Sequence, residues 1–325
     1  MGNLNVAVLG REGFGARLGK KGTSSDITFY NLKRGEDTVT FVEPTKYPER
    51  LAPLFFAVSI AKMAVVVVDQ IGPSFGEMAL MLHSAGIERG YIFLSGVQRD
   101  KVAQLVKGTL LEAYEIFDGD VNSLRETMIS HASHGMEAAA AGGGAGGCVA
   151  VDHAFNVKGT GTVVLGTVMC GTVRRHDEMR VLPGEKMAQV RSIQKHDDDF
   201  DSASEGDRVG LALRGIQPED LGRGNLLTSC SSFETAHRLE AQAELLRYWP
   251  GPMDAGTVVH VGHWMQFVQG KIEEVGAERD WHRPALKVSL GKAIAYLPGA
   301  HGVLMQLDGK KLRVAGRIQL SAPRK

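Results

Sequence analysis

The pattern of apolar and polar positions divides the chain into two regions with different periods. In the first region, residues 63–69 (MAVVVVD) are apolar almost throughout, which is typical of a parallel strand covered on both faces. Residues 76–86 and 98–114 instead have the spacing of amphipathic helices, and Asn122 is the expected cap of a last helix. Strands that alternate with helices predict a doubly wound α/β domain over residues 1–137.

The second region follows a low-complexity stretch, AAAAGGGAGG at residues 138–147, which predicts a flexible linker. Beyond it, short alternating apolar runs are separated by Gly-bearing turns, a pattern that favours strands over helices. A polar stretch at residues 229–234 separates these strands into two sets. We therefore expect two β-barrels in series, at residues 148–231 and 232–325.

Composition adds a few constraints. Lys+Arg and Asp+Glu both number 37 in the 325 residues, so the charge balance neither excludes nor supports an RNA partner. The three cysteines, Cys148, Cys170 and Cys230, lack CxxC spacing, which favours scattered reduced thiols over a zinc or disulfide framework. The residues predict no signal peptide, and the most apolar run, residues 57–68, is too short to span a bilayer. We therefore expect a cytoplasmic protein without a membrane partner.

A Gly-rich turn, GREGFG at residues 10–15, follows the first predicted strand. Its frame resembles a nucleotide-binding P-loop, in which backbone N–H groups cradle phosphates, a Lys reaches them and a hydroxyl binds Mg²⁺. Ala16 and Arg17 stand where that Lys and Ser/Thr belong. A plain Gly-rich turn between a strand and a helix explains the same residues. The candidate cofactor-binding residues of this turn and its surroundings are Gly10, Gly13, Gly15, Ala16, Arg17, Lys20 and Lys21.

Other polar constellations are weaker. His260 and His263 form an H-x-x-H pair without a third ligand at recognisable spacing, so we predict no metal site. The acidic run at residues 196–199 is interpreted as a solvated turn. The tryptophans of the last region either stack on RNA or pack the barrel, and packing is favoured because they form no platform: these are Trp249, Trp264 and Trp281.

Taken with the domain order, several segments resemble translational GTPases of the elongation factor Tu type. These segments are GTGTVVLGTVMCG (159–171), RGIQPEDLGRGNLL (214–227) and VLMQLDGKKLRVAGRIQL (303–320). Within that family, the chain resembles a branch related to the selenocysteine-specific factor (SelB), found in methanogenic archaea. Three segments carry this likeness: GKKGTSSDITFYN (19–31), FVE…YP and VDHAFNVKGTG (151–161). The resemblance covers nearly the whole chain and is strongest between residues 148 and 228.

The resemblance implies a translation-factor architecture, with a P-loop-type G domain followed by two β-barrels. It implies GTP or GDP with Mg²⁺ as cofactors, and a specialised aminoacyl-tRNA as partner. Pyrrolysyl-tRNA is one cargo proposed for this branch. The ribosome is a further implied partner, and DNA is not.

The nucleotide motifs of that family are only partly matched. In the third motif, D-T-P-G-H, Glu43 keeps a carboxylate, Lys46 replaces the Gly, and Tyr47 stands at the position of the catalytic His. A phenol does not orient an attacking water as an imidazole does near neutral pH. Thr23 offers a hydroxyl for the first switch segment, whereas residues 95–100 (SGVQRD) lack the guanine-reading N-K-x-D register. We therefore expect GTP binding to be weakened and GTP hydrolysis to be lost or strongly altered.

The resemblance also suggests residues that contact the acceptor end of a tRNA. Arginines would contact phosphates, and residues near two loops of the first barrel would line an aminoacyl pocket. Alternatively, Arg214 and Arg223 support turns by pairing with Glu219 or Asp220. The tRNA-binding candidates are His153, Phe155, Asn156, Arg191, Arg214, Asp220 and Arg223.

Two functional hypotheses follow. The first is a SelB-like translation elongation factor that binds a specialised aminoacyl-tRNA and has a degenerate nucleotide site. The second is a non-catalytic RNA- or protein-binding regulatory module derived from such a factor. An unrelated P-loop enzyme is disfavoured by the two barrels. No fourth domain is evident after the second barrel, and we expect no messenger-structure-dependent recoding by this chain alone.

Overall fold

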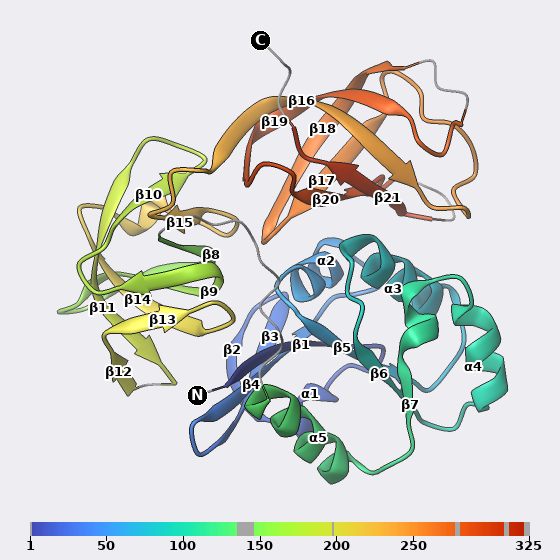
Figure 1. The fold of residues 1–325 in the computed structure, drawn as a ribbon, viewed down its shortest axis with the longest axis horizontal. Coiled ribbons are helices and arrows are strands. Elements are labelled where there is room, and N and C mark those ends of the chain that lie inside the picture. The colour runs from blue at the N-terminus through green and yellow to red at the C-terminus, as the bar shows by residue number, and fades with distance from the viewer. Residues whose placement is uncertain (1, 135–145, 197, 277–279, 309–311, 322–325) are drawn as a thin grey trace. The chain divides into compact units, whose positions relative to one another are not determined.

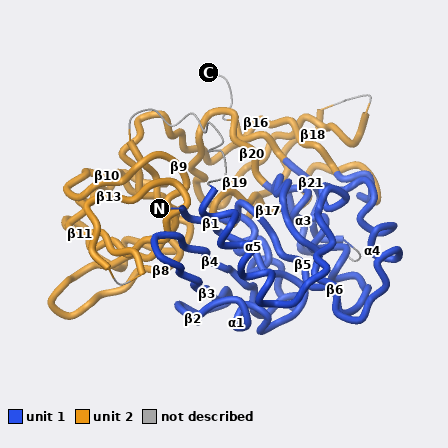
Figure 2. Tube along the Cα trace, turned by 60° about the horizontal axis from the view of Figure 1, so that its bottom comes forward, with its two compact units in different colours: residues 1–137, 246–249, 303–317 blue, residues 138–245, 250–302, 318–325 orange. Residues whose placement is uncertain are grey.

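The computed structural model describes residues 2–134, 146–196, 198–276, 280–308 and 312–321. The chain forms two compact units, each assembled from segments that are distant in sequence (Figure 2). Unit 1 comprises residues 1–137, 246–249 and 303–317, and unit 2 comprises residues 138–245, 250–302 and 318–325. Most of the expected linker (138–147), namely 138–145, lies outside the described residues, as does position 197 of the acidic run.

Unit 1 contains a seven-stranded sheet in the order β2-β3-β4-β1-β5-β6-β7 (Figure 1). Strands β4, β1, β5, β6 and β7 run parallel, whereas β2 and β3 extend the sheet in antiparallel fashion. Helices α2 and α3 lie on one face, and α1 and α5 lie on the other. In chain order the elements are β1 (Asn3–Leu9), α1 (Gly15–Leu18), β2 (Lys20–Ser24), β3 (Ile27–Arg34), β4 (Asp37–Pro44), α2 (Ala52–Ser59), β5 (Met63–Val68), α3 (Pro73–Ala85), β6 (Gly90–Leu94), α4 (Arg99–Val106), the 3₁₀ turn η1 (Leu110–Ala113), β7 (Glu115–Phe117) and α5 (Val121–Ser133).

The doubly wound α/β domain predicted from the sequence is confirmed. All six residues of β5 are buried, because helices cover the sheet on both sides. Helix α2 was not expected, since its apolar residues leave no polar stripe to separate it from the adjoining strand. No helix among the described residues combines the length and apolar character that crossing a membrane requires.

Two local expectations in this unit are wrong. The single helix expected over residues 98–114 ends at Val106, because Gly108 has a φ of +75° and η1 follows. The cap of α5 is Asp120 and not Asn122. The Asp120 carboxylate accepts a hydrogen bond of 2.8 Å from the Ser123 amide, which satisfies a free N–H of the first turn.

The central β-rich part of unit 2 forms an eight-stranded sheet in which six strands close into a ring. The order is β10-β15-β8-β9-β14-β11-β12, β13 pairs with β9, and an additional pairing of β10 with β11 closes the ring. Inward-facing residues such as Val164, Leu211 and Ile193 form its core. The strands are β8 (Gly147–Val157), β9 (Gly161–Arg174), β10 (Glu178–Leu182), β11 (Met187–Lys195), β12 (Asp198–Phe200), β13 (Ser202–Ser204), β14 (Arg208–Arg214) and β15 (Leu226–Thr228), with the 3₁₀ turn η2 (Pro218–Asp220) before β15.

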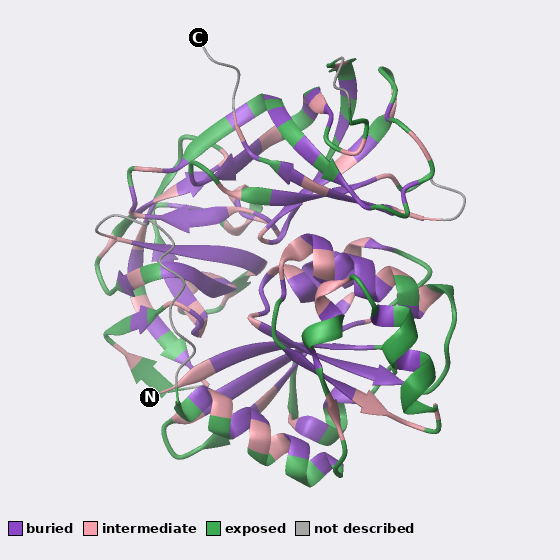
Figure 3. Ribbon diagram, turned by 45° about the vertical axis from the view of Figure 1, so that its right-hand side comes forward, coloured by how far each residue is buried: buried purple, intermediate pink, exposed green. Residues whose placement is uncertain are grey.

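The last six strands form a closed barrel in the order β16-β19-β18-β17-β20-β21. Buried and exposed residues alternate along β16, as expected for a strand with one face on a core (Figure 3). The expectation of an α/β domain followed by two barrels is therefore confirmed as a fold class. The strands are β16 (Glu234–Leu245), β17 (Val258–His263), β18 (Gln266–Val275), β19 (Ala285–Tyr296), β20 (His301–Met305) and β21 (Val314–Gln319).

Candidate functional site

The Gly-rich turn connects the end of β1 to the short helix α1. Gly10 has a φ of +103°, and a Cβ there would lie 2.0 Å from the Val67 carbonyl oxygen. Gly13 also has a positive φ, of +78°, while Gly15 begins α1. Glycine is therefore required at position 10 by both conformation and space. The backbone has the strand–turn–helix context that the P-loop frame predicted.

The amide groups of this turn are bound to a carboxylate of the same chain. Glu43, at the end of β4, is only 2% exposed, and its Oε2 accepts a hydrogen bond of 2.7 Å from the Gly15 amide. Its Oε1 accepts a second bond from the Gly13 amide. Burial raises the pKa of Glu43, the two amide bonds oppose this, and nearby Glu12 adds to the rise.

The other cofactor-binding candidates do not form a phosphate site around these amides. Ala16 is exposed, and the Arg17 guanidinium lies 5.3 Å from the centre of the Phe14 ring. Lys20 and Lys21 are exposed residues of β2, where Thr23 also lies half-buried. GTP with Mg²⁺ does not fit this arrangement, because a carboxylate occupies the two amides and the P-loop Lys and Ser/Thr are missing.

Tyr47, at the family position of the catalytic His, makes contacts within unit 1. Its hydroxyl donates a 2.9 Å hydrogen bond to the Ser74 carbonyl, near the start of α3. Burial, followed by the nearby Glu77 carboxylate, raises the pKa of Tyr47 well above its ordinary value. The phenol therefore stays protonated at neutral pH and does not act as a base. It serves here as a hydrogen-bond donor to the backbone.

The base-reading motifs of a G domain are also replaced by local structure. Gly96, after β6, has a φ of +86°, and Asp100 lies in the first turn of α4. Asp120, in the region of the fifth motif, caps α5. Gly96 and Asp120 thus have local conformational roles in the regions where a G domain carries its guanine-binding groups.

A groove of about 660 Å³ lies on the central sheet of unit 2 and contains three of the predicted tRNA-binding residues. Phe155 of β8 is 39% exposed there, with Arg191 of β11 and Arg214 at the end of β14. Three arginines and one aspartate line the groove, which favours an anionic ligand. The remaining lining residues are Val157, Thr160, Val163, Leu165, Arg175, His176, Gln189, Ser192, Gln194, Asp199, Gly210 and Ala212.

His153 and Arg223 belong to a separate network around Asp152, which is 3% exposed. The Arg208 guanidinium donates two hydrogen bonds to the Asp152 carboxylate, one of them 2.9 Å long. His153 contacts the same carboxylate, and Arg223 Nε donates to the Asp152 carbonyl at 3.5 Å. Burial raises the pKa of Asp152, but Arg208 and His153 outweigh it and hold the pKa below its ordinary value.

The remaining two tRNA candidates are also placed. Asn156 is an exposed residue near the β8–β9 turn, opposite Thr162. Asp220 forms an ion pair with Lys186, and the alternative in which Arg214 or Arg223 pairs with Glu219 or Asp220 stays a prediction.

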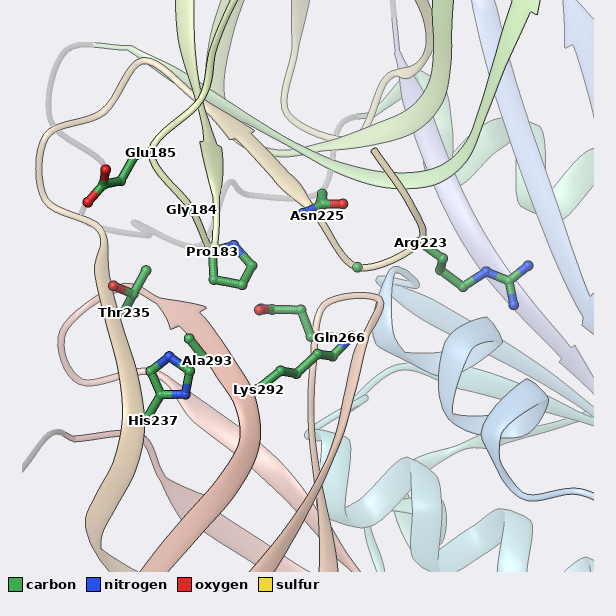
Figure 4. Close-up of a pocket in the computed structure, with 11 residues that line it drawn as sticks. Pro183, Gly184, Glu185, Arg223, Asn225, Thr235, His237, Gln266, Lys292 and Ala293 are labelled. Carbon is green, nitrogen blue, oxygen red and sulfur yellow. The ribbon is translucent and has the colours of Figure 1, made fainter. Parts of the chain in front are cut away.

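A second cavity in unit 2, of about 520 Å³, lies where loops of the central sheet meet strands of the last barrel (Figure 4). Arg223 and Asn225 line it from the loop before β15, and Gln266 from β18. His237 and Lys292 also line it but were not predicted. They lie on β16 and β19, and no local pattern in the sequence marks either one. The other lining residues are Pro183, Gly184, Glu185, Gly224, Thr235 and Ala293.

The cysteines are all free and buried, but the expectation that they are scattered is wrong. Cys148 lies opposite Cys170 in the β8–β9 pairing. Burial raises the pKa of the Cys148 thiol, and Cys170 and Cys230 add to the rise. Among the described residues, no group of three or more His, Cys, Asp or Glu side chains is arranged to hold a metal ion.

Comparisons with known proteins agree with this architecture. Residues 161–228 match the family described as elongation factor Tu domain 2. An uncharacterized protein of Methanocaldococcus jannaschii is 38% identical over 323 residues, covering 97% of this chain and 99% of that protein. The selenocysteine-specific elongation factor of the same organism is 51% identical over 79 residues, 24% of this chain and 17% of that factor.

Solved structures show the same fold over the whole chain. Translation elongation factor SelB from Methanococcus maripaludis, in complex with the GTP analogue GppNHp, has a TM-score of 0.82. That match covers 100% of this chain and 80% of the SelB chain at 21% identity. The chain also matches a bacterial selenocysteine-specific elongation factor with a TM-score of 0.80. That match covers 100% of this chain and 59% of the bacterial factor at 21% identity.

The α/β domain followed by two barrels thus defines the architecture of a translation factor. The chain belongs to the same family as the uncharacterized M. jannaschii protein, and its residues 161–228 relate it to the elongation factor Tu/SelB-like translational GTPases.

Proposed function

We propose that this protein is a SelB-like translation factor that binds the acceptor end of a specialised aminoacyl-tRNA through the groove on its central sheet. The single observation that carries the proposal is the presence of Phe155, Arg191 and Arg214 together in that groove. The family relation to selenocysteine-specific factors supports it. The ribosome is the further partner that the same relation supports.

The groove combines the two features that unpaired RNA ends require. An exposed aromatic ring offers a face on which a base stacks, at about 1–3 kcal/mol per base. Arginine guanidinium groups bind phosphate oxygens in a bidentate manner and stay charged at all physiological pH values. Arg191 is already oriented, because its Nη1 donates to the Thr160 carbonyl at 3.2 Å. A cavity of about 660 Å³ also has the size of a pocket for a nucleotide-sized group.

Filter binding tests the proposal with total aminoacyl-tRNA from a methanogenic archaeon and with the same pool after deacylation. We expect the wild type to prefer a charged species, with an affinity that falls steeply as salt rises. Phe155→Ala should weaken binding by about fivefold to 150-fold, the equivalent of one lost stacking contact. Arg214→Ala should reduce the slope of log K against log salt by about 0.7–0.9.

Arg283→Ala is the matched control. Arg283 is an exposed arginine of the same unit that pairs loosely with Glu244, at 3.5 Å. Arg283→Ala should change the affinity and the salt slope less than Arg214→Ala does. Equal effects of Arg214→Ala and Arg283→Ala, or no binding of any charged tRNA by the wild type, would contradict the proposal.

A second candidate is a regulatory module that keeps the shape of the factor and binds RNA or protein without nucleotide. The carboxylate on the Gly13 and Gly15 amides is the observation that favours it. Aminoacylation discriminates the two candidates: a carrier binds charged tRNA more tightly than uncharged tRNA, whereas a module without an aminoacyl pocket binds both equally.

A further inference from the structure

We propose that the Glu43 carboxylate is a built-in ligand of the phosphate loop, which it holds in a closed state that accepts no nucleotide. This inference concerns the α/β domain alone and does not depend on the RNA-binding proposal. It explains why the loop keeps its glycines although the Lys and Ser/Thr that serve a nucleotide are gone.

The contacts are those of a bound oxyanion. In a P-loop, successive backbone N–H groups point into a concave turn and bind phosphate oxygens. Here the two oxygens of one carboxylate accept from two amides of that turn, Gly13 and Gly15. A carboxylate that accepts backbone N–H bonds is stabilised in the same way as a phosphate at this position. The anion is supplied by β4, which pairs directly with β1.

The loop closes tightly around this carboxylate. A Cβ at position 15 would lie 2.7 Å from Glu43 Oε2 and 2.5 Å from ring carbons of Tyr30. Both side chains are buried, Tyr30 at 6% exposure and Glu43 at 2%. Gly15 is therefore required by the carboxylate and the ring that pack on it. Its presence in the sequence does not depend on a nucleotide.

A nucleotide phosphate would have to compete with this carboxylate for the same amides. Two anions in one buried site repel each other strongly, so one must leave. In a working P-loop a lysine compensates part of the phosphate charge. Position 16 is alanine here, and Arg17 lies against Phe14. Displacement of Glu43 would also cost its carboxylate both hydrogen bonds to the loop amides. This loss adds to the free-energy cost of nucleotide binding.

Calorimetry on the full chain tests the inference, with Mg²⁺–GTP, Mg²⁺–GDP and inorganic pyrophosphate as the probes. We expect no binding to the wild type at millimolar ligand. Glu43→Ala frees both amides, so we expect it to bind pyrophosphate at least about tenfold more tightly than the wild type. Micromolar binding of GTP or GDP by the wild type would overturn the inference.

Glu12→Ala is the matched control, because Glu12 is an exposed carboxylate of the same turn. It removes the same charge and leaves the Glu43 contacts in place. We expect it to gain no pyrophosphate binding. An equal gain in Glu12→Ala and Glu43→Ala would show a general effect of charge and would overturn the inference, as would a folded Glu43→Ala protein that gains nothing.

A measurement on the wild type decides the matter if Glu43→Ala does not fold. The amide resonances of Gly13 and Gly15 should shift together with the Glu43 carboxyl resonance as the pH is lowered, since the three groups are hydrogen-bonded. The same amides should not respond to millimolar Mg²⁺–GTP at neutral pH. Independent titration, or a response to GTP, would contradict a closed loop.

Discussion

At the scale of single residues, His263 illustrates how burial changes an ordinary side chain. It ends β17, is 7% exposed, and stacks on Trp264 with ring centres 4.6 Å apart. Its Nδ1–H donates to the His301 carbonyl at 3.1 Å, whereas its Nε2 has no hydrogen-bond partner in the described part of the chain. Burial lowers the pKa of His263 to about 4, which keeps the ring neutral at physiological pH.

The lowered pKa predicts a loss of stability in mild acid. Because the unfolded chain takes up the proton near pH 6.5 and the folded chain only near pH 4, stability is complete above pH 6.5 and falls between these values. The loss should reach about 3 kcal/mol. Urea unfolding followed by tryptophan fluorescence at pH 7.5, 6, 5 and 4 measures it. His263→Phe should remove most of this slope, and His237→Gln, a change at an exposed histidine, should retain it; equal slopes in both variants would refute the assignment.

The candidate sites show what residue patterns do and do not reveal. Glu43 was recognised as the carboxylate of the third motif, but its partners are backbone amides, which carry no mark in a sequence. In the sequence, Arg208 is only one of several basic residues of the first barrel. Its pairing with Asp152 joins two strands 56 positions apart, so only the folded sheet brings the two charges together. By contrast, Phe155 and Arg214 were found because they lie in segments with a recognisable family pattern.

At the scale of elements, the β8–β9 hairpin depends on a close backbone approach at Gly171. This residue has a φ of +67°, and a Cβ would lie 1.9 Å from the Gly146 carbonyl oxygen. Gly171→Ala should therefore destabilise unit 2 by more than about 2 kcal/mol, since it combines backbone strain with a clash. Gly159→Ala is the control, because Gly159 has a φ of +84° with nothing near its Cβ position. Denaturant unfolding compares them, and equal losses would mean that the close approach is unimportant.

Element by element, the sequence predicts strands better than the boundaries between short elements. The fully apolar run at residues 63–69, for example, predicts a strand where β5 occurs. The strand β2 and the short strands β12 and β13 were missed because their residues are polar and mostly exposed. Such strands form because a neighbouring strand offers unpaired backbone N–H and C=O groups. The residues of the short strand therefore do not predict it.

At the scale of the whole molecule, the sequence predicts consecutive domains at residues 1–137, 148–231 and 232–325. The compact units of the structure are not consecutive, since unit 1 also includes residues 246–249 and 303–317. Composition and periodicity locate breaks along the chain, but they do not show which distant segment packs against which. The three-domain boundaries therefore stay a prediction, although the fold class is correct.

One ion pair shows how a late segment contributes to unit 1. Arg313 Nε donates to Glu77 Oε1 of α3 at 2.8 Å, and Nη2 bonds to Glu77 Oε2 and, at 3.1 Å, to the Pro48 carbonyl. The two side chains are only 22% and 11% exposed, so water screens the pair weakly. Arg313→Ala should cost about 2–3 kcal/mol, because it leaves a half-buried carboxylate without its partner.

A double-mutant cycle with Glu77→Ala measures the coupling of this pair by thermal unfolding. We expect the two changes to be non-additive by about 1 kcal/mol or more, since each variant already removes the shared contact. Hydrogen exchange should rise in Arg313→Ala both in α3 and in residues 303–317, because the pair holds these segments together.

Arg238→Ala is the control. Its guanidinium is 70% exposed and lies 3.6 Å from Glu273, so its loss should change stability by less than about 0.5 kcal/mol. Additive effects of Arg313→Ala and Glu77→Ala would show that unit 1 does not depend on this contact.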